Sequence, residues 1–78
     1  MPTIVREGGF SLRIYVNDHS PPHVHAFKAE GEAKISIEGS VPYLLSSEKM
    51  GLKDIKKALR LVRKHQAKLL EHWRDIHG

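Results

Sequence analysis

The chain contains no cysteine among its 78 residues. Disulfide bonds and thiolate zinc sites are therefore excluded, and any bound metal would have to take histidine and carboxylate ligands. The absence of cysteine suits a reducing compartment, so we expect a cytoplasmic protein. No apolar run approaches the roughly 20 residues of a membrane span, and the first residues lack the charged-then-apolar pattern of a signal peptide.

A second domain is also excluded, because 78 residues form a single domain over positions 1–78. Acidic residues are scarce only in the last third of the chain. Residues 1–50 carry five basic and six acidic groups, whereas residues 51–78 carry eight and three, which accounts for the net charge of +4. This distribution favours a polyanion or an acidic protein as a partner.

Alternating apolar residues in the first half of the chain predict β-strands. We expect an α+β fold with a three- or four-stranded, mainly antiparallel sheet. The Glu30-Gly31 pair suits a two-residue hairpin turn. The expected strands are Thr3–Arg6, Phe10–Val16, His23–Lys28 and Ala33–Glu38, with a further short strand at Val41–Leu45.

From Leu52 to Ile76 there is neither proline nor glycine, and apolar residues recur at steps of three and four. This period predicts one long amphipathic helix that packs on one face of the sheet, with a basic face opposite the apolar stripe. At 1.5 Å per residue it would be about 37 Å long, more than the roughly 30 Å width of such a domain. Either it bends near Lys64–Gln66 or its end extends into a partner.

The segment NDHSPPHVHAF, residues 17–27, carries the clearest chemical signal. Pro21 and Pro22 restrict the backbone that leads into a strand, and strand geometry places His23 and His25 on one face. Two imidazoles on one surface can bind a metal ion or transfer protons near neutral pH.

A turn at Glu30-Gly31 would place His23 opposite Glu38 and His25 opposite Ser36. The isoleucines of the second strand would then face inward and the histidines outward into solvent. Arg13 and Tyr15 of the preceding strand would join the histidines on this outer face. The opposite register would bury Phe27 beside the two imidazoles instead.

Three functions fit this arrangement. A divalent metal such as zinc could bind His23 and His25 with His19 or Glu38 as the third ligand. Without a metal, a histidine with Glu38, Arg13 and Tyr15 is similar to the side-chain set of small ribonucleases. The same residues could also bind RNA or a protein without catalysis.

The chain resembles a family of small bacterial proteins, the domain-of-unknown-function family numbered 4160. The shared features are the MPTI start, Arg13 with Tyr15, the segment NDHSPPHVH, close to the family pattern D-H-x-P-P-H-x-H, and the helix ending in LLEHW. By position, the motif residues are Asp18, His19, Pro21, Pro22, His23 and His25.

The resemblance implies a genetic neighbour, because family members are often encoded beside a second small protein, as toxins and antitoxins are. We therefore expect one component of a two-protein module that acts on or binds RNA or a partner protein. Leu69, Leu70, Trp73 and Ile76 near the helix end would be exposed in an isolated chain. We accordingly expect Trp73 at a contact with a second copy or with the neighbouring product.

Overall fold

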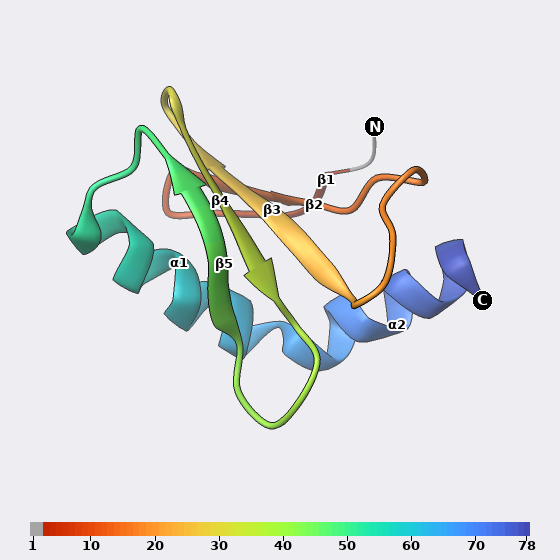
Figure 1. Ribbon diagram of the computed structural model, residues 1–78. Helices are drawn as coiled ribbons and strands as arrows, with labels where there is room; N and C mark the ends of the chain where they lie inside the picture. The colour runs from red at the N-terminus through yellow and green to blue at the C-terminus, as the bar shows by residue number, and fades with distance from the viewer. Residues whose placement is uncertain (1–2) are drawn as a thin grey trace.

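The computed structural model describes residues 3–78 as one antiparallel sheet with two helices below it (Figure 1). The strands follow chain order across the sheet. The α+β class is confirmed, but the sheet has five strands instead of three or four, and two helices replace the single long one. The elements are β1 (Thr3–Glu7), β2 (Phe10–Arg13), β3 (His23–Lys28), β4 (Gly31–Ser36), β5 (Tyr43–Glu48), α1 (Leu52–Lys64) and α2 (Gln66–His77).

The β5 strand extends beyond the predicted segment Val41–Leu45 into a polar stretch. All six of its residues are exposed, and β5 lies at the edge of the sheet. Without a buried face, nothing imposes an alternation of apolar and polar residues on this strand. Its neighbour β4 begins at Gly31, where a Cβ atom would lie 2.5 Å from the backbone oxygen of Lys49. Glycine is therefore needed at this position so that the two backbones can approach.

The hairpin between β3 and β4 turns at Ala29 and Glu30, because Lys28 pairs with Gly31. The predicted turn at Glu30-Gly31 is therefore wrong, because it lies one residue too late in the chain. Ala29 takes a positive φ of 52°. Val24 consequently lies opposite Ile35. Because the pairing is shifted by two residues, every side chain keeps its predicted face.

The β2 strand ends at Arg13 and not at the predicted Val16. The chain turns at once, and the Asp18 N–H donates to the carbonyl oxygen of Tyr15 over 3.0 Å. Ile14 still reaches the core and is fully buried, whereas Val16 is 64% exposed. A local turn therefore overrides the alternation that predicted a longer strand.

The single predicted helix is interrupted at His65, whose φ and ψ are −108° and 14°. The Gln66 side chain stabilises the start of α2, since its amide donates to the carbonyl oxygens of Ile37 at 2.8 Å and Gly39 at 3.0 Å. The bend was one of the two alternatives for a helix of this length. It is the alternative that the fold adopts.

After the bend, α2 turns its apolar side onto the sheet, where Leu69 is fully buried and Trp73 is 6% exposed. The exposed helix end that led us to expect Trp73 at an interface is therefore absent. Neither helix in the described part of the chain has the length and apolar character needed to cross a bilayer. The core between sheet and helices consists of Val5, Phe10, Leu12, Ile14, Val24, Ala26, Ala33, Ile35, Ile37, Ala58, Leu61, Val62, Leu69 and Trp73.

Candidate metal centre

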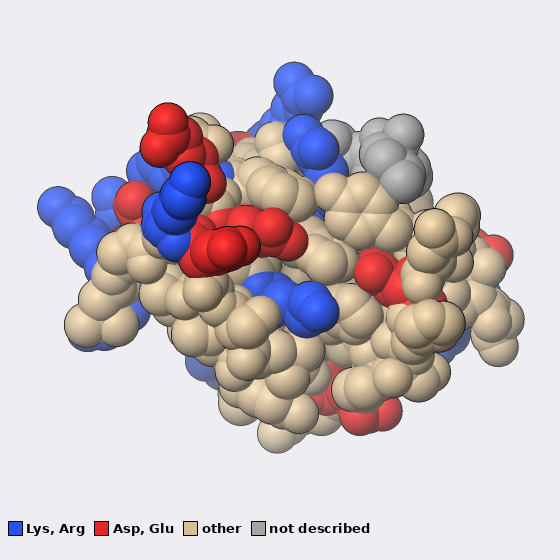
Figure 2. Space-filling model, turned by 45° about the horizontal axis from the view of Figure 1, so that its top comes forward, with Lys and Arg blue, Asp and Glu red and all other residues tan. Residues whose placement is uncertain are grey.

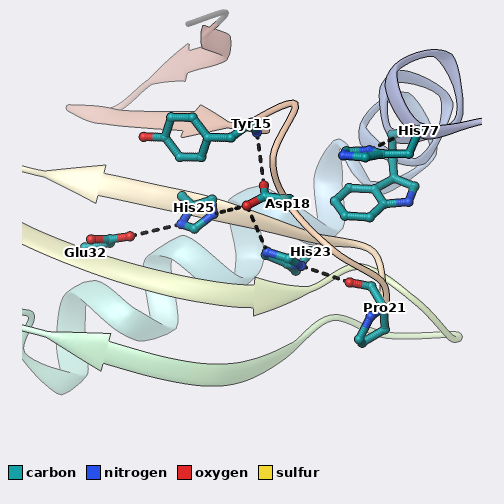
Figure 3. Close-up of polar contacts among 8 residues, drawn as sticks. Tyr15, Asp18, Pro21, His23, His25, Glu32 and His77 are labelled. Carbon is teal, nitrogen blue, oxygen red and sulfur yellow. Dashed lines mark hydrogen bonds and ion pairs between the residues drawn. The ribbon is translucent and has the colours of Figure 1, made fainter.

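Asp18, His23 and His25 form a cluster on the outer face of the sheet, where β3 begins near the end of α2; we call it the His–Asp cluster. His23 and His25 lie at the start of β3, and alternation along the strand directs both imidazoles to this outer face. The segment between β2 and β3 crosses the same face and carries Asp18 over them (Figure 3). The two prolines end this segment and lead directly into β3.

The cluster is buried, contrary to our expectation of a solvent-open histidine face. His23 is 7% exposed and His25 is 8% exposed. Tyr15 covers His25 edge-on, with ring centroids 4.8 Å apart, and Trp73 of α2 packs beside His23 at 5.4 Å. The face of the strand is as predicted, but the loop and the helix end shield it from water.

A single carboxylate oxygen faces both imidazoles. Asp18 Oδ1 lies 3.1 Å from His25 Nε2 and 3.4 Å from His23 Nε2. One ligand atom from each of the three residues lies within 4.8 Å of the others. Tetrahedral zinc with bonds of 2.0 to 2.1 Å holds its ligand atoms about 3.3 Å apart. The two Asp18 distances are close to this value, of which the one to His25 is also a hydrogen-bond distance, and the limit of 4.8 Å for the whole cluster is wider.

Both imidazoles are oriented through their other nitrogen. His23 Nδ1 lies 2.9 Å from the carbonyl oxygen of Pro21, and His25 Nδ1 lies 3.0 Å from Glu32 Oε2 (Figure 3). A carbonyl oxygen only accepts hydrogen bonds, so Nδ1 of His23 is the protonated nitrogen. Metal-binding histidines are typically held in this way, by a backbone carbonyl or a carboxylate on the nitrogen remote from the metal.

The backbone holds the Asp18 carboxylate in place, because the Tyr15 N–H donates to Asp18 Oδ2 over 3.0 Å. Burial alone would raise the pKa of Asp18. The hydrogen bond from the Tyr15 amide and, when Nε2 of the rings is protonated, the adjacent His25 and His23 outweigh it and lower the pKa below its usual value. Asp18 is thus kept as the anion that a metal ligand must be.

Two of the predicted site residues lie apart from the two histidines in the structure. His19 is exposed and lies outside the His–Asp cluster, whose third member is Asp18. Glu38, predicted opposite His23, is also exposed. The two-residue shift in register places Ser36 opposite His23 instead, and the β4 carboxylate that contacts a histidine is Glu32, beside His25. Asp18 was visible in the sequence only as a motif position, because nothing in a strand pattern shows that a loop folds back over the strand.

Arg13 and Tyr15 do lie beside the histidines, as predicted. Arg13 pairs with His25 across β2 and β3, and its guanidinium carbon lies 4.8 Å from the centre of the Phe27 ring. The Arg13 Nε atom is buried without a hydrogen-bond partner among the described residues. Tyr15 packs against His25.

An open groove of about 460 Å³ adjoins the His–Asp cluster. Figure 2 shows the sheet face, where a basic side chain near the middle lies between acidic side chains on either side. The groove is open to solvent, although the imidazoles themselves are buried. Its lining residues are Asn17, Asp18, His19, Ser20, Pro21, His23, Lys34, Leu45 and Ser46.

Fold and site together define a small α+β protein with a buried cluster of two histidines and one aspartate. The family model described as "Domain of unknown function (DUF4160)" matches residues 9–74, and the chain belongs to this family. No curated protein matches the chain. No solved structure matches it either.

Proposed function

We propose that this protein binds one zinc ion through Asp18 Oδ1, His23 Nε2 and His25 Nε2. The observation that carries the proposal is the orientation of the two imidazoles. Each has Nδ1 placed against a hydrogen-bond acceptor, and each presents Nε2 to the same carboxylate oxygen. With both Nδ1 atoms protonated, three acceptor atoms converge on one point, and a cation at that point satisfies all of them.

The competing arrangement is purely electrostatic, with both imidazoles protonated and paired with Asp18 and Glu32. It would place two positively charged rings 5.3 Å apart, each more than nine-tenths buried. The Asp18 and Glu32 carboxylates offset the repulsion between the rings, so this pairing is the arrangement that a metal ion has to displace. A bound metal instead coordinates neutral imidazoles.

The donor set selects the class of metal. Imidazole nitrogen suits zinc, copper, iron and nickel, whereas magnesium and calcium prefer sites built from oxygen alone. Two histidines and one carboxylate are a known zinc set, and three protein ligands leave one position for water or a further ligand.

Calorimetric titration of chelator-treated protein with Zn²⁺ tests the proposal. We expect one ion per chain, and a loss of binding of at least tenfold in His23→Gln and in His25→Gln. The matched control is His19→Gln, because this neighbouring histidine is exposed and outside the cluster. Absence of zinc binding, or equal losses in all three variants, would overturn the proposal.

A second candidate function is the binding of an acidic partner protein, as one half of the two-protein module expected from the family resemblance. The exposed edge of the sheet favours it, since Tyr43, Leu44 and Leu45 on β5 are 52%, 37% and 42% exposed. An unpaired edge strand is a template for a strand from another chain. The net charge of +4 opposes pairing with a second copy and favours an acidic chain.

Sedimentation of the purified chain, alone and with the product of an adjacent gene, tests this second function. We expect a monomer alone and a heterodimer in the mixture, which Tyr43→Ala weakens. A stable homodimer, or no association in the mixture, would count against it.

A further inference from the structure

We infer that the groove beside the His–Asp cluster binds a small phosphate monoester, which completes the coordination of the zinc ion and pairs with Lys34. This inference rests on the proposed zinc site. Asp18 and His23 belong to both the cluster and the wall of the groove, so an ion held by the cluster borders the groove. The fourth coordination position of a three-ligand zinc site is the one that a ligand occupies.

The charges around the groove favour an anion once the metal is bound. Lys34 lies on β4 in the groove wall and takes part in none of the ion pairs found among the described residues. Without metal, the Lys34 ammonium and the Asp18 carboxylate cancel. A zinc ion therefore makes the groove positive, with a charge of about +2 from its own lining and about +1 when the Glu32 carboxylate beside His25 is included. A phosphate monoester, whose charge at neutral pH is roughly −1.5 to −2, compensates this charge.

The shape of the donor set favours phosphate over carboxylate. Ser46 lies opposite Lys34 in the β4–β5 pairing and adds a hydroxyl group to the groove. The metal ion, the ammonium group and the hydroxyl group are three separate partners for oxygen atoms. A phosphate monoester presents three unesterified oxygens, whereas a carboxylate presents two. Leu45 adds an apolar surface on which the organic part of the ester can lie.

The neighbouring depression limits the ligand to a single phosphate group. It has a volume of about 390 Å³ and shares Lys34 and Ser46 with the groove, but it is otherwise lined by Glu32, Ser47 and Glu48. A nucleic-acid strand that continued across the sheet would place its next phosphates against two carboxylates. The outer face therefore suits a small monoester better than a polynucleotide, which needs a run of basic contacts.

Titration of the zinc-loaded and the metal-free protein with phenyl phosphate and with inorganic phosphate, followed by ³¹P NMR, tests the inference. We expect binding to the zinc-loaded form, at least tenfold weaker binding to the metal-free form, and a loss of about tenfold in Lys34→Gln. Ser46→Ala should give a smaller loss, and Lys68→Gln on α2 is the matched charge control. By linkage, phosphate should strengthen zinc binding by the same factor as zinc strengthens phosphate binding.

The outcomes separate this inference from the proposed function. Zinc binding without any effect of phosphate would leave the zinc site standing and overturn the phosphate site. Failure of zinc binding would overturn both. Equal phosphate binding in the Lys34→Gln and Lys68→Gln variants, or tighter binding of a single-stranded oligonucleotide than of phenyl phosphate, would also overturn the inference.

Discussion

Glu32 acts on the proposed zinc site through His25, because its carboxylate holds the imidazole at Nδ1 over 3.0 Å. We predict that Glu32→Ala lowers zinc affinity by about 10- to 100-fold, as loss of such a supporting partner does in other metal sites. Competition with a chromophoric chelator measures the affinity. Glu48→Ala is the matched control, since Glu48 lines the same depression as Glu32 and makes no hydrogen bond to either histidine in the described structure. Equal losses in the two variants would show that only the overall charge matters.

Glu7, the last residue of β1, contacts the junction of the two helices, since its carboxylate lies 2.8 Å from Lys64 Nζ and 3.1 Å from His65 Nε2. The hydrogen bond from Lys64, followed by that from His65, lowers the pKa of Glu7 below 4.5. A carboxyl group whose pKa is lowered by folding contributes stability above its unfolded pKa, and this contribution is lost as the pH falls through the folded pKa.

NMR titration of the Glu7 side chain tests this effect. We predict a pKa below 4.5 in the intact chain and a return toward that value in Lys64→Ala, whereas Lys68→Ala should leave it unchanged. A Glu7 pKa that did not respond to the loss of Lys64 would mean that the ion pair does not persist in solution.

At the scale of the elements, Gln66 determines how α2 leaves α1, because its amide satisfies the carbonyl groups of Ile37 and Gly39 at the end of β4. We predict that Gln66→Ala lowers the free energy of unfolding by about 1 to 3 kcal/mol, since a partly buried carbonyl group loses its donor. Lys68→Ala, on the exposed side of the same helix, should change it by less than about 0.5 kcal/mol. Urea unfolding followed by circular dichroism measures both. Equal effects would mean that the bend at His65 does not depend on this contact.

The helix break also shows why the apolar pattern alone was insufficient. The periodicity of residues 52–76 is continuous apart from Gln66, which looked like a gap in the stripe. In the fold Gln66 begins α2 directly after the break at His65, and its polar side chain reaches the sheet. A polar residue in an apolar stripe therefore marks a tertiary contact that the period does not reveal.

At the scale of the whole molecule, Trp73 belongs to the core and also covers His23. The centres of the two rings lie 5.4 Å apart. We predict that Trp73→Ala lowers the free energy of unfolding by about 3 to 5 kcal/mol, a large part of the roughly 5 to 15 kcal/mol that a domain possesses. Trp73→Phe should retain most of the stability. Urea unfolding of the metal-free variants measures the change.

The same variants decide between burial and the interface expected from the sequence. If Trp73→Ala left stability unchanged and instead altered sedimentation, Trp73 would lie at a contact with a partner after all. The toxin–antitoxin-like pairing, the binding of RNA and the ribonuclease activity stay predictions, because neither the family match nor the fold tests them.

Sequence alone determined the fold class, the position of β3, the start of the helical region at Leu52, and the common face of His23 and His25. These properties depend on local periodicity: alternation in a strand and the 3.6-residue repeat in a helix are visible in short windows. The shift in the hairpin did not disturb them, because a displacement of two residues preserves the face of every side chain.

Only the tertiary structure decided which residues complete the site. Asp18 reaches the imidazoles because a loop folds back over β3, and Glu32 replaces Glu38 because the hairpin turns at Ala29 and Glu30. Burial of the histidines likewise depends on Tyr15 and Trp73, which arrive from a turn and from the second helix. Loop reversal, register and helix bending are set by the balance of contacts between distant segments, and a local pattern carries no record of that balance.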